Sequence, residues 1–256
     1  MSESVSEVAN EKMMSLLDHL NEMKNHLLRI AIALVVCGAA SFIFAKQILR
    51  WLLRPMEKYE GGYEIIATGP TTMIGLFMKI SLFSGAVVAM PFIVYQVLQF
   101  VLPALTRQEK RALFWIVPGA TVFFGGGVAF AYFAMVPAAI PFLLGFWADI
   151  VSQKWMVDEY LPFVTGLMFW VGVSFETPLI MAFVAKLGVV TARQMFSVWK
   201  FAVVGIGVLA AFITPTPDPF NMGLVMLPLI SLYFFGVFLA RLVQPKEARV
   251  EEAGAA

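Results

Sequence analysis

The sequence predicts an all-α membrane protein whose six transmembrane helices are kinked into a concave, glove-like bundle, with both ends of the chain on one side. Three observations predict this fold class. Sixty per cent of the 256 residues are hydrophobic, only 14% are charged, and the apolar residues gather in runs long enough to cross a bilayer. A soluble domain of this length could not bury so much apolar surface, so a soluble enzyme is excluded.

Each predicted membrane helix is an apolar run between polar residues. The six ranges are Leu27–Ala45, Thr72–Leu98, Ala112–Pro137, Leu161–Ala185, Phe201–Ile213 and Met222–Ala240. The fifth run gives about 20 Å of helix against a hydrocarbon core of about 30 Å, so we expect the fifth and sixth helices to be short. Prolines inside the runs should bend them, which favours a concave body over a straight bundle: Pro91, Pro118, Pro178 and Pro228.

The chain is expected to form one membrane domain over residues 1–256. Its six-helix core spans 27–242, and polar tails at 1–12 and 244–256 should be mobile. Residues 13–28 precede the first membrane run as an amphipathic cytoplasmic helix, because leucine and methionine recur there every three or four positions.

The distribution of lysine and arginine predicts the topology. Twelve fall in the N-terminal segment, the second and fourth loops and the C-terminal tail, whereas five fall on the other side: Lys46, Arg50, Arg54, Lys58 and Lys154. Both termini should therefore be cytoplasmic. The loop at 54–70 and a surface cap at 141–160 should be external, and Pro55 and Asp218 are candidate residues of the external loops.

Glu176 is the only ionisable residue in the run 161–185. A charged carboxylate at that depth costs about 2.5–3.5 kcal/mol on insertion scales, so an intramembrane ionisable residue is by default a candidate functional site. A membrane environment favours the neutral carboxyl, which can donate as well as accept a hydrogen bond. Glu176 therefore predicts a polar contact within the membrane.

Two rival function classes were weighed against this carboxyl. A proton- or ion-coupled secondary transporter could use Glu176 as its carrier group, but such transporters usually have broken helices arranged in repeats, and no internal repeat is visible. An intramembrane hydrolase needs a nucleophile–base pair or a metal, and both histidines, His19 and His26, precede the first membrane run. We expect no enzymatic activity.

The trio His19, Glu22 and His26 shares one helix face, which is a pattern that metal ligands can use. No further ligand is placed to complete a metal site. We therefore expect no metal and no cofactor, and the net charge of +1 gives no indication of a nucleic-acid partner.

The segment His19–Arg29, H-L-N-E-M-K-N-H-L-L-R, resembles the H-L-x-E-L-R motif of the TatC family, the receptor subunits of the twin-arginine protein translocase. Other segments are similar to that family in the same order, and the resemblance runs to about Leu242. They are P-F-I-V-Y-Q at 91–96, F-V-L-P-A-L at 100–105 with Glu109, F-A-Y-F at 130–133, G-V-S-F-E-T-P at 172–178, and Thr214-Pro215 with Asp218. One departure is Lys24, which stands where the family has arginine and lacks its planar fork.

The resemblance implies export of folded proteins across the bacterial cytoplasmic (inner) membrane, using the proton-motive force. It also implies that Glu22 and Glu109 bind the two consecutive arginines of a cargo signal peptide at the cytoplasmic surface, with Leu20, Lys24 and Phe100 beside them. The chemistry fits, because guanidinium forks match carboxylates with charge-assisted hydrogen bonds.

The resemblance finally implies partners. These are single-span TatA- and TatB-type subunits, further copies of this chain within a receptor complex, and membrane lipid. We expect Glu176, together with Gln96 and Tyr132, to be the intramembrane polar residues at which the helix of a partner docks, because polar side chains hydrogen-bond across membrane helices.

Overall fold

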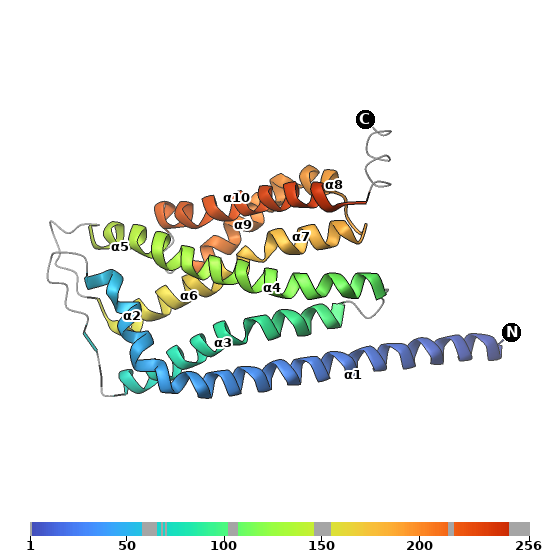
Figure 1. The fold of residues 1–256 in the computed structure, drawn as a ribbon, viewed down its shortest axis with the longest axis horizontal. Helices are drawn as coiled ribbons and strands as arrows, with labels where there is room; N and C mark the ends of the chain where they lie inside the picture. The colour runs from blue at the N-terminus through green and yellow to red at the C-terminus, as the bar shows by residue number, and fades with distance from the viewer. Residues whose placement is uncertain are drawn as a thin grey trace.

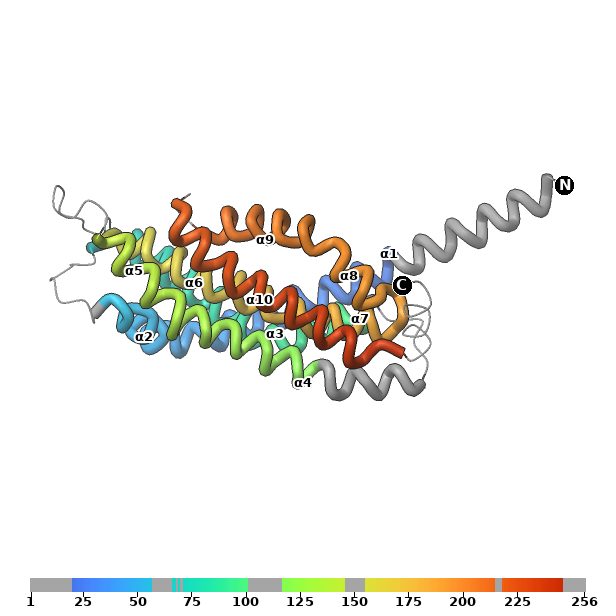
Figure 2. Tube along the Cα trace, turned by 90° about the horizontal axis from the view of Figure 1, so that it is seen from above, coloured from blue at the N-terminus to red at the C-terminus, as the bar shows by residue number. Residues whose placement is uncertain are grey.

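Helices make up almost all of the described chain, as the apolar runs predict. The computed structural model of the protein describes residues 2–57, 66–67, 69, 71–101, 107–145, 155–214 and 218–245. Of residues 2–19, 57, 101 and 107–116 it describes the backbone alone. Within these ranges the single extended feature is an isolated parallel bridge between Ile66 and Met156. Figures 1 and 2 show the helices aligned along one long axis.

Successive membrane helices run antiparallel along the bundle (Figure 1). Three of the predicted membrane helices are built from more than one element, joined by a 3₁₀ turn at Phe42–Phe44, a π-helical turn at Ala131–Met135 and a break at Glu176. The α-helices are α1 (Ser2–Ser41), α2 (Ala45–Glu57), α3 (Thr72–Val101), α4 (Arg107–Phe130), α5 (Val136–Gly145), α6 (Val157–Phe175), α7 (Thr177–Lys186), α8 (Ala192–Ser197), α9 (Trp199–Ile213) and α10 (Pro219–Val243).

The six-helix membrane architecture is confirmed. Five helical stretches of the described chain are long and apolar enough to cross a membrane, and α9 is a sixth, shorter apolar helix of 15 residues. The expectation of a short sixth helix was wrong, because α10 has 25 residues. It begins earlier than predicted since Asp218 caps its N-terminus by accepting from the Asn221 N–H at 2.7 Å, and Pro219 fits the first turn.

Two predicted loop boundaries were also wrong. The loop expected from residue 54 starts later, because α2 continues to Glu57 and includes a buried Pro55 in its last turn. The surface cap expected at 141–160 is helical at both ends, since α5 runs to Gly145 and α6 begins at Val157. In each case apolar side chains continue into the bundle core and extend the helix beyond the most hydrophobic window.

Close crossings between helices depend on glycine. A methyl group at Gly85 of α3 would lie 2.5 Å from the backbone N and Cα of Gly38 in α1, so only glycine allows the two backbones to touch. In the glycine triplet of α4, only Gly127 makes such a contact, 2.8 Å from the Cα of Gly172 in α6, whereas a methyl at Gly125 would meet open space.

Two tyrosine hydroxyls hold α2 across the end of the bundle. The carbonyl oxygen of Trp51 has no helical partner four residues on, because Pro55 lacks an N–H. Tyr132 replaces that partner: its hydroxyl donates to the Trp51 carbonyl at 2.6 Å, and its ring stacks on the indole with centroids 3.6 Å apart. The Tyr160 hydroxyl donates to the neighbouring Leu52 carbonyl at 3.0 Å.

Removing the Tyr132 hydroxyl should therefore destabilise the protein. Tyr132→Phe keeps the ring but leaves the Trp51 carbonyl without this partner in a half-buried site, which costs about 1–3 kcal/mol. The exposed Tyr95→Phe, which removes only a contact with Gln99, is the matched control and should change stability by about 0.5 kcal/mol or less. Thermal unfolding in detergent micelles, followed by circular dichroism, checks this; equal midpoints for the two variants would contradict it.

Candidate functional site

The first candidate site begins where α1 packs against the C-terminal end of α3. Nδ1 of His26 lies 2.5 Å from Oε1 of Gln96, and the His26 ring lies 6.2 Å from the ring of Phe100, centroid to centroid. Gln96 is only 3% exposed. Gln96 is therefore paired within the chain, and its role as a docking residue stays a prediction.

Glu22 lies one helical turn before His26, on the same face of α1. Its side chain is exposed, as are those of Leu20 and Lys24. The His26 contacts turn this face of α1 towards the end of α3, so the Glu22 carboxylate lies near the same end as Phe100. Lys24, two residues after Glu22, falls on a different face of the helix.

Glu109 lies in the first turn of α4, where the helix dipole favours an acidic residue. Its side chain falls outside the described residues, so the structure gives no Glu22–Glu109 distance. The backbone limits the distance between the end of α3 at Val101 and the start of α4 at Arg107 to at most about 23 Å, along six peptide units. Figure 1 shows these two ends side by side, with α1 running along α3.

The second candidate site is the break between α6 and α7. Glu176 lies between the two helices, with Pro178 following in the first turn of α7. The Glu176 side chain is 5% exposed, and its Oε1 atom has no hydrogen-bond partner in the described part of the chain. A buried acceptor of this kind is costly and unusual in a folded protein.

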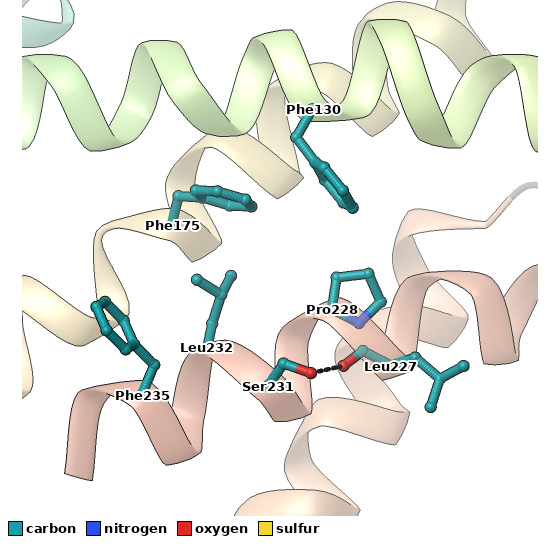
Figure 3. Close-up of a pocket in the computed structure, with 7 residues that line it drawn as sticks. All are labelled: Phe130, Phe175, Leu227, Pro228, Ser231, Leu232 and Phe235. Carbon is teal, nitrogen blue, oxygen red and sulfur yellow. Dashed lines mark hydrogen bonds between the residues drawn. The ribbon is translucent and has the colours of Figure 1, made fainter. Parts of the chain in front are cut away.

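An open apolar recess of about 490 Å³ lies beside this break (Figure 3). Phe130 of α4 and Phe175 of α6 form one wall, with ring centroids 5.7 Å apart. The opposite wall is α10, which contributes Leu227, Pro228, Ser231, Leu232 and Phe235. Its one polar side chain, Ser231, donates to the Leu227 carbonyl at 2.9 Å, so the recess presents apolar surface.

One expectation for this region needs correction. Glu176 was expected on the wall of a concave face, but it is buried, and its neighbour Phe175 lines the recess instead. Just after Glu176, Pro178 and Met181 of α7 pack tightly against Gly236 of α10. Tyr132 is 4% exposed and bonded to α2, and its role in docking stays a prediction.

Sequence reasoning missed the role of His26, which was considered only as a metal ligand. Among the described residues no three His, Cys, Asp or Glu side chains gather as a metal site would require. The spacing offered a signal, since Gln96 and Phe100 are four residues apart on α3, as Glu22 and His26 are on α1. Nothing in the sequence shows that these two faces meet.

Comparison with known proteins decides the family. A family model described as "Sec-independent protein translocase protein (TatC)" matches residues 18–228. The chain belongs to the TatC family. The matched range contains Glu22, Glu109 and Glu176.

TatC proteins of bacteria and chloroplasts align with most of the chain. "Sec-independent protein translocase protein TatC" of Synechocystis sp. is 38% identical over 239 residues, covering 93% of this chain and 92% of that protein. The chloroplastic TATC of Arabidopsis thaliana is 36% identical, covering 92% and 69% respectively. A solved structure described as "Crystal Structure of Twin Arginine Translocase Receptor- TatC" superposes with a TM-score of 0.80 at 35% identity, covering 88% of this chain and 99% of that one.

The TatC match establishes the general function. The protein is a multi-pass membrane subunit of the twin-arginine translocase. A secondary transporter built on Glu176 is not favoured, because family, relatives and structure all agree on protein translocation.

Proposed function

We propose that this chain is the subunit that binds the twin-arginine signal peptides of folded cargo and nucleates the translocon. Glu22 and Glu109 bind the two arginines. The observation that supports this most is the contact of His26 with Gln96 and Phe100, because it brings the Glu22 face of α1 to the end of α3. Glu109 then follows in the first turn of α4, the next helix along the chain.

The chemistry of these residues suits two adjacent guanidinium groups. A carboxylate accepts two parallel N–H bonds from an arginine fork, which a lysine cannot supply. Leu20, 53% exposed, and Phe100 offer apolar surface for the residues that flank the arginine pair. Since Lys24 lies on another face of α1, we propose that it contributes positive charge near the membrane surface and makes no direct contact with the arginines.

The topology follows from the charge count and is part of the proposal. Both termini lie in the cytoplasm of a bacterium, and the chain spans its inner membrane. The site formed by α1, the C-terminal end of α3 and the N-terminal end of α4 then faces the cytoplasm, where folded cargo is present before export. Translocation draws on the proton-motive force, and single-span TatA- and TatB-type subunits assemble on this chain together with further copies of it.

We propose that a membrane helix of such a subunit docks beside Glu176. The apolar recess between α4, α6 and α10 provides an apolar surface against which a helix can pack. The Oε1 atom of Glu176, unpaired among the described residues, provides one polar contact. Because Glu176 is 5% exposed, docking requires Phe175 or α7 to move aside. A hydrogen bond between membrane helices contributes about 0.6 kcal/mol on average and up to about 1.7 kcal/mol.

Substitutions at Glu176 test the docking proposal. Glu176→Gln keeps a donor and an acceptor without a charge, whereas Glu176→Ala leaves the polar group of the partner unpaired. We expect the glutamine variant to retain more complex assembly and more export than the alanine variant. A photo-crosslinker at position 176 should also form an adduct with a single-span subunit. If no such adduct appears in resting or cargo-bound complexes, the docking proposal is wrong and the Glu176 carboxyl makes its contacts within its own chain.

Signal-peptide binding tests the receptor assignment. Loss of either carboxylate should weaken a twin-arginine peptide while leaving the fold of the protein intact, because Glu22 is exposed. Binding that does not depend on these carboxylates would place the receptor site elsewhere.

A further inference from the structure

Helix α2 lies at the end of the bundle away from the start of α1 (Figures 1 and 2), and basic residues recur along its sequence. Lys46, Arg50 and Arg54 are four residues apart, so they follow one face of the helix, and all three are exposed. The opposite face is buried, with Leu52 at 0% and Met56 at 4% exposure. We call the three exposed residues the basic face of α2.

No acidic side chain neutralises the basic face of α2 within the part of the chain that the structure describes. None of its three cations forms an ion pair or a ring contact there. Asp158 and Glu159, at the same end of the bundle, lie in the first turn of α6, where they complement the helix dipole. Three positive charges over about 12 Å of helix create a local positive potential that attracts anions.

The basic face of α2 also lies where a membrane span ends. The helical stretch that is long and apolar enough to cross a membrane runs from Leu20 to Met56. Just before α2, Ile43 is 75% exposed and Phe44 is 58% exposed, and such side chains suit the acyl region of a bilayer. Because the apolar face of α2 packs on the bundle, the basic face is the side that α2 turns towards its surroundings.

We propose that the basic face of α2 binds the phosphate headgroups of anionic phospholipids in the leaflet at this end of the bundle. Arginine forks form charge-assisted hydrogen bonds with phosphate oxygens. An anionic lipid fits better than an acidic protein segment, because exposed Ile43 and Phe44 adjoin the basic face and offer apolar surface to acyl chains. This site is separate from the peptide site and from the recess beside Glu176, so it does not rest on the proposed function.

The test is a local measurement of lipid preference in nanodiscs of phosphatidylcholine that contain phosphatidylglycerol. Cys37 is the single cysteine, so Cys37→Ala with Gln47→Cys allows one fluorophore beside the basic face. Spin-labelled phosphatidylglycerol should quench this fluorophore more than spin-labelled phosphatidylcholine does. Arg50→Gln with Arg54→Gln should lower that preference at least about fivefold, since one basic residue at an anionic surface contributes about 1 kcal/mol.

A matched control removes two exposed lysines from the other end of the bundle. Lys186→Gln with Lys200→Gln should leave quenching at position 47 unchanged, and Arg50→Lys with Arg54→Lys should keep most of the preference. In the native chain, high salt should abolish it. Equal quenching by the two lipids, or a preference that survives loss of both arginines, overturns the proposal. The proposal is also overturned if the two lipids quench equally and the Arg50→Gln, Arg54→Gln variant loses a protein partner. That result would assign the basic face to a protein.

Discussion

Gly85→Ala should separate α1 from α3 and destabilise the protein by about 3 kcal/mol or more. The new methyl group would lie 2.5 Å from the Gly38 backbone and 2.9 Å from the carbonyl carbon of Cys37. Overpacking usually costs about 1–3 kcal/mol, and here the obstacle is backbone that cannot change rotamer. Thermal unfolding and size-exclusion chromatography in detergent measure the effect.

Gly75→Ala is the matched control because it adds the same methyl group to the same helix. Nothing lies within 4 Å of its added Cβ, so stability should change by no more than about 1 kcal/mol through helix propensity. If Gly85→Ala unfolds at the same temperature as Gly75→Ala, the α1–α3 crossing is looser than described. The contact of His26 with Gln96 would then not fix the Glu22 face.

Removing both proposed carboxylates should nearly abolish binding of a twin-arginine peptide. A hydrogen bond to a charged group contributes about 1.5–3 kcal/mol. Glu22→Ala with Glu109→Ala should therefore raise Kd by about 100-fold or more. Peptide titration followed by fluorescence anisotropy, on protein reconstituted in nanodiscs, gives the comparison.

Two controls separate recognition from general charge. Lys24→Arg keeps the charge of α1 and should change Kd by about twofold or less. Glu159→Ala removes an exposed acidic side chain from the opposite end of the bundle and should have no effect. An unchanged Kd in the double carboxylate variant would show that the arginines bind elsewhere.

The membrane helices could be predicted from the sequence because apolar length is a local property. Glu176 also stood out locally, as a single carboxyl in an apolar run. Helix ends were less predictable: Pro55 was expected in a loop, but a tyrosine 77 positions later compensates for its missing N–H, and α2 continues. Only the folded chain shows that compensation.

The partners of buried polar groups could not be predicted, because each depends on contacts between distant segments. Gln96 is paired with a histidine 70 residues earlier, and Tyr132 with a carbonyl 81 residues earlier. Both were expected to face a partner protein. An intramembrane polar residue with no polar residue near it in the sequence suggests a hydrogen-bond partner on another protein. Glu176 differs from these two, because one of its oxygens has no partner among the described residues even in the folded chain.

The measurement that tests the receptor assignment most directly compares two peptides on the native protein. One is a signal peptide with two consecutive arginines, and the other has lysines at those two positions. Lysine keeps the charge but cannot form the two parallel hydrogen bonds to a carboxylate. The account predicts at least about tenfold tighter binding of the arginine peptide, or about 1.4 kcal/mol. Equal affinities would contradict recognition by Glu22 and Glu109.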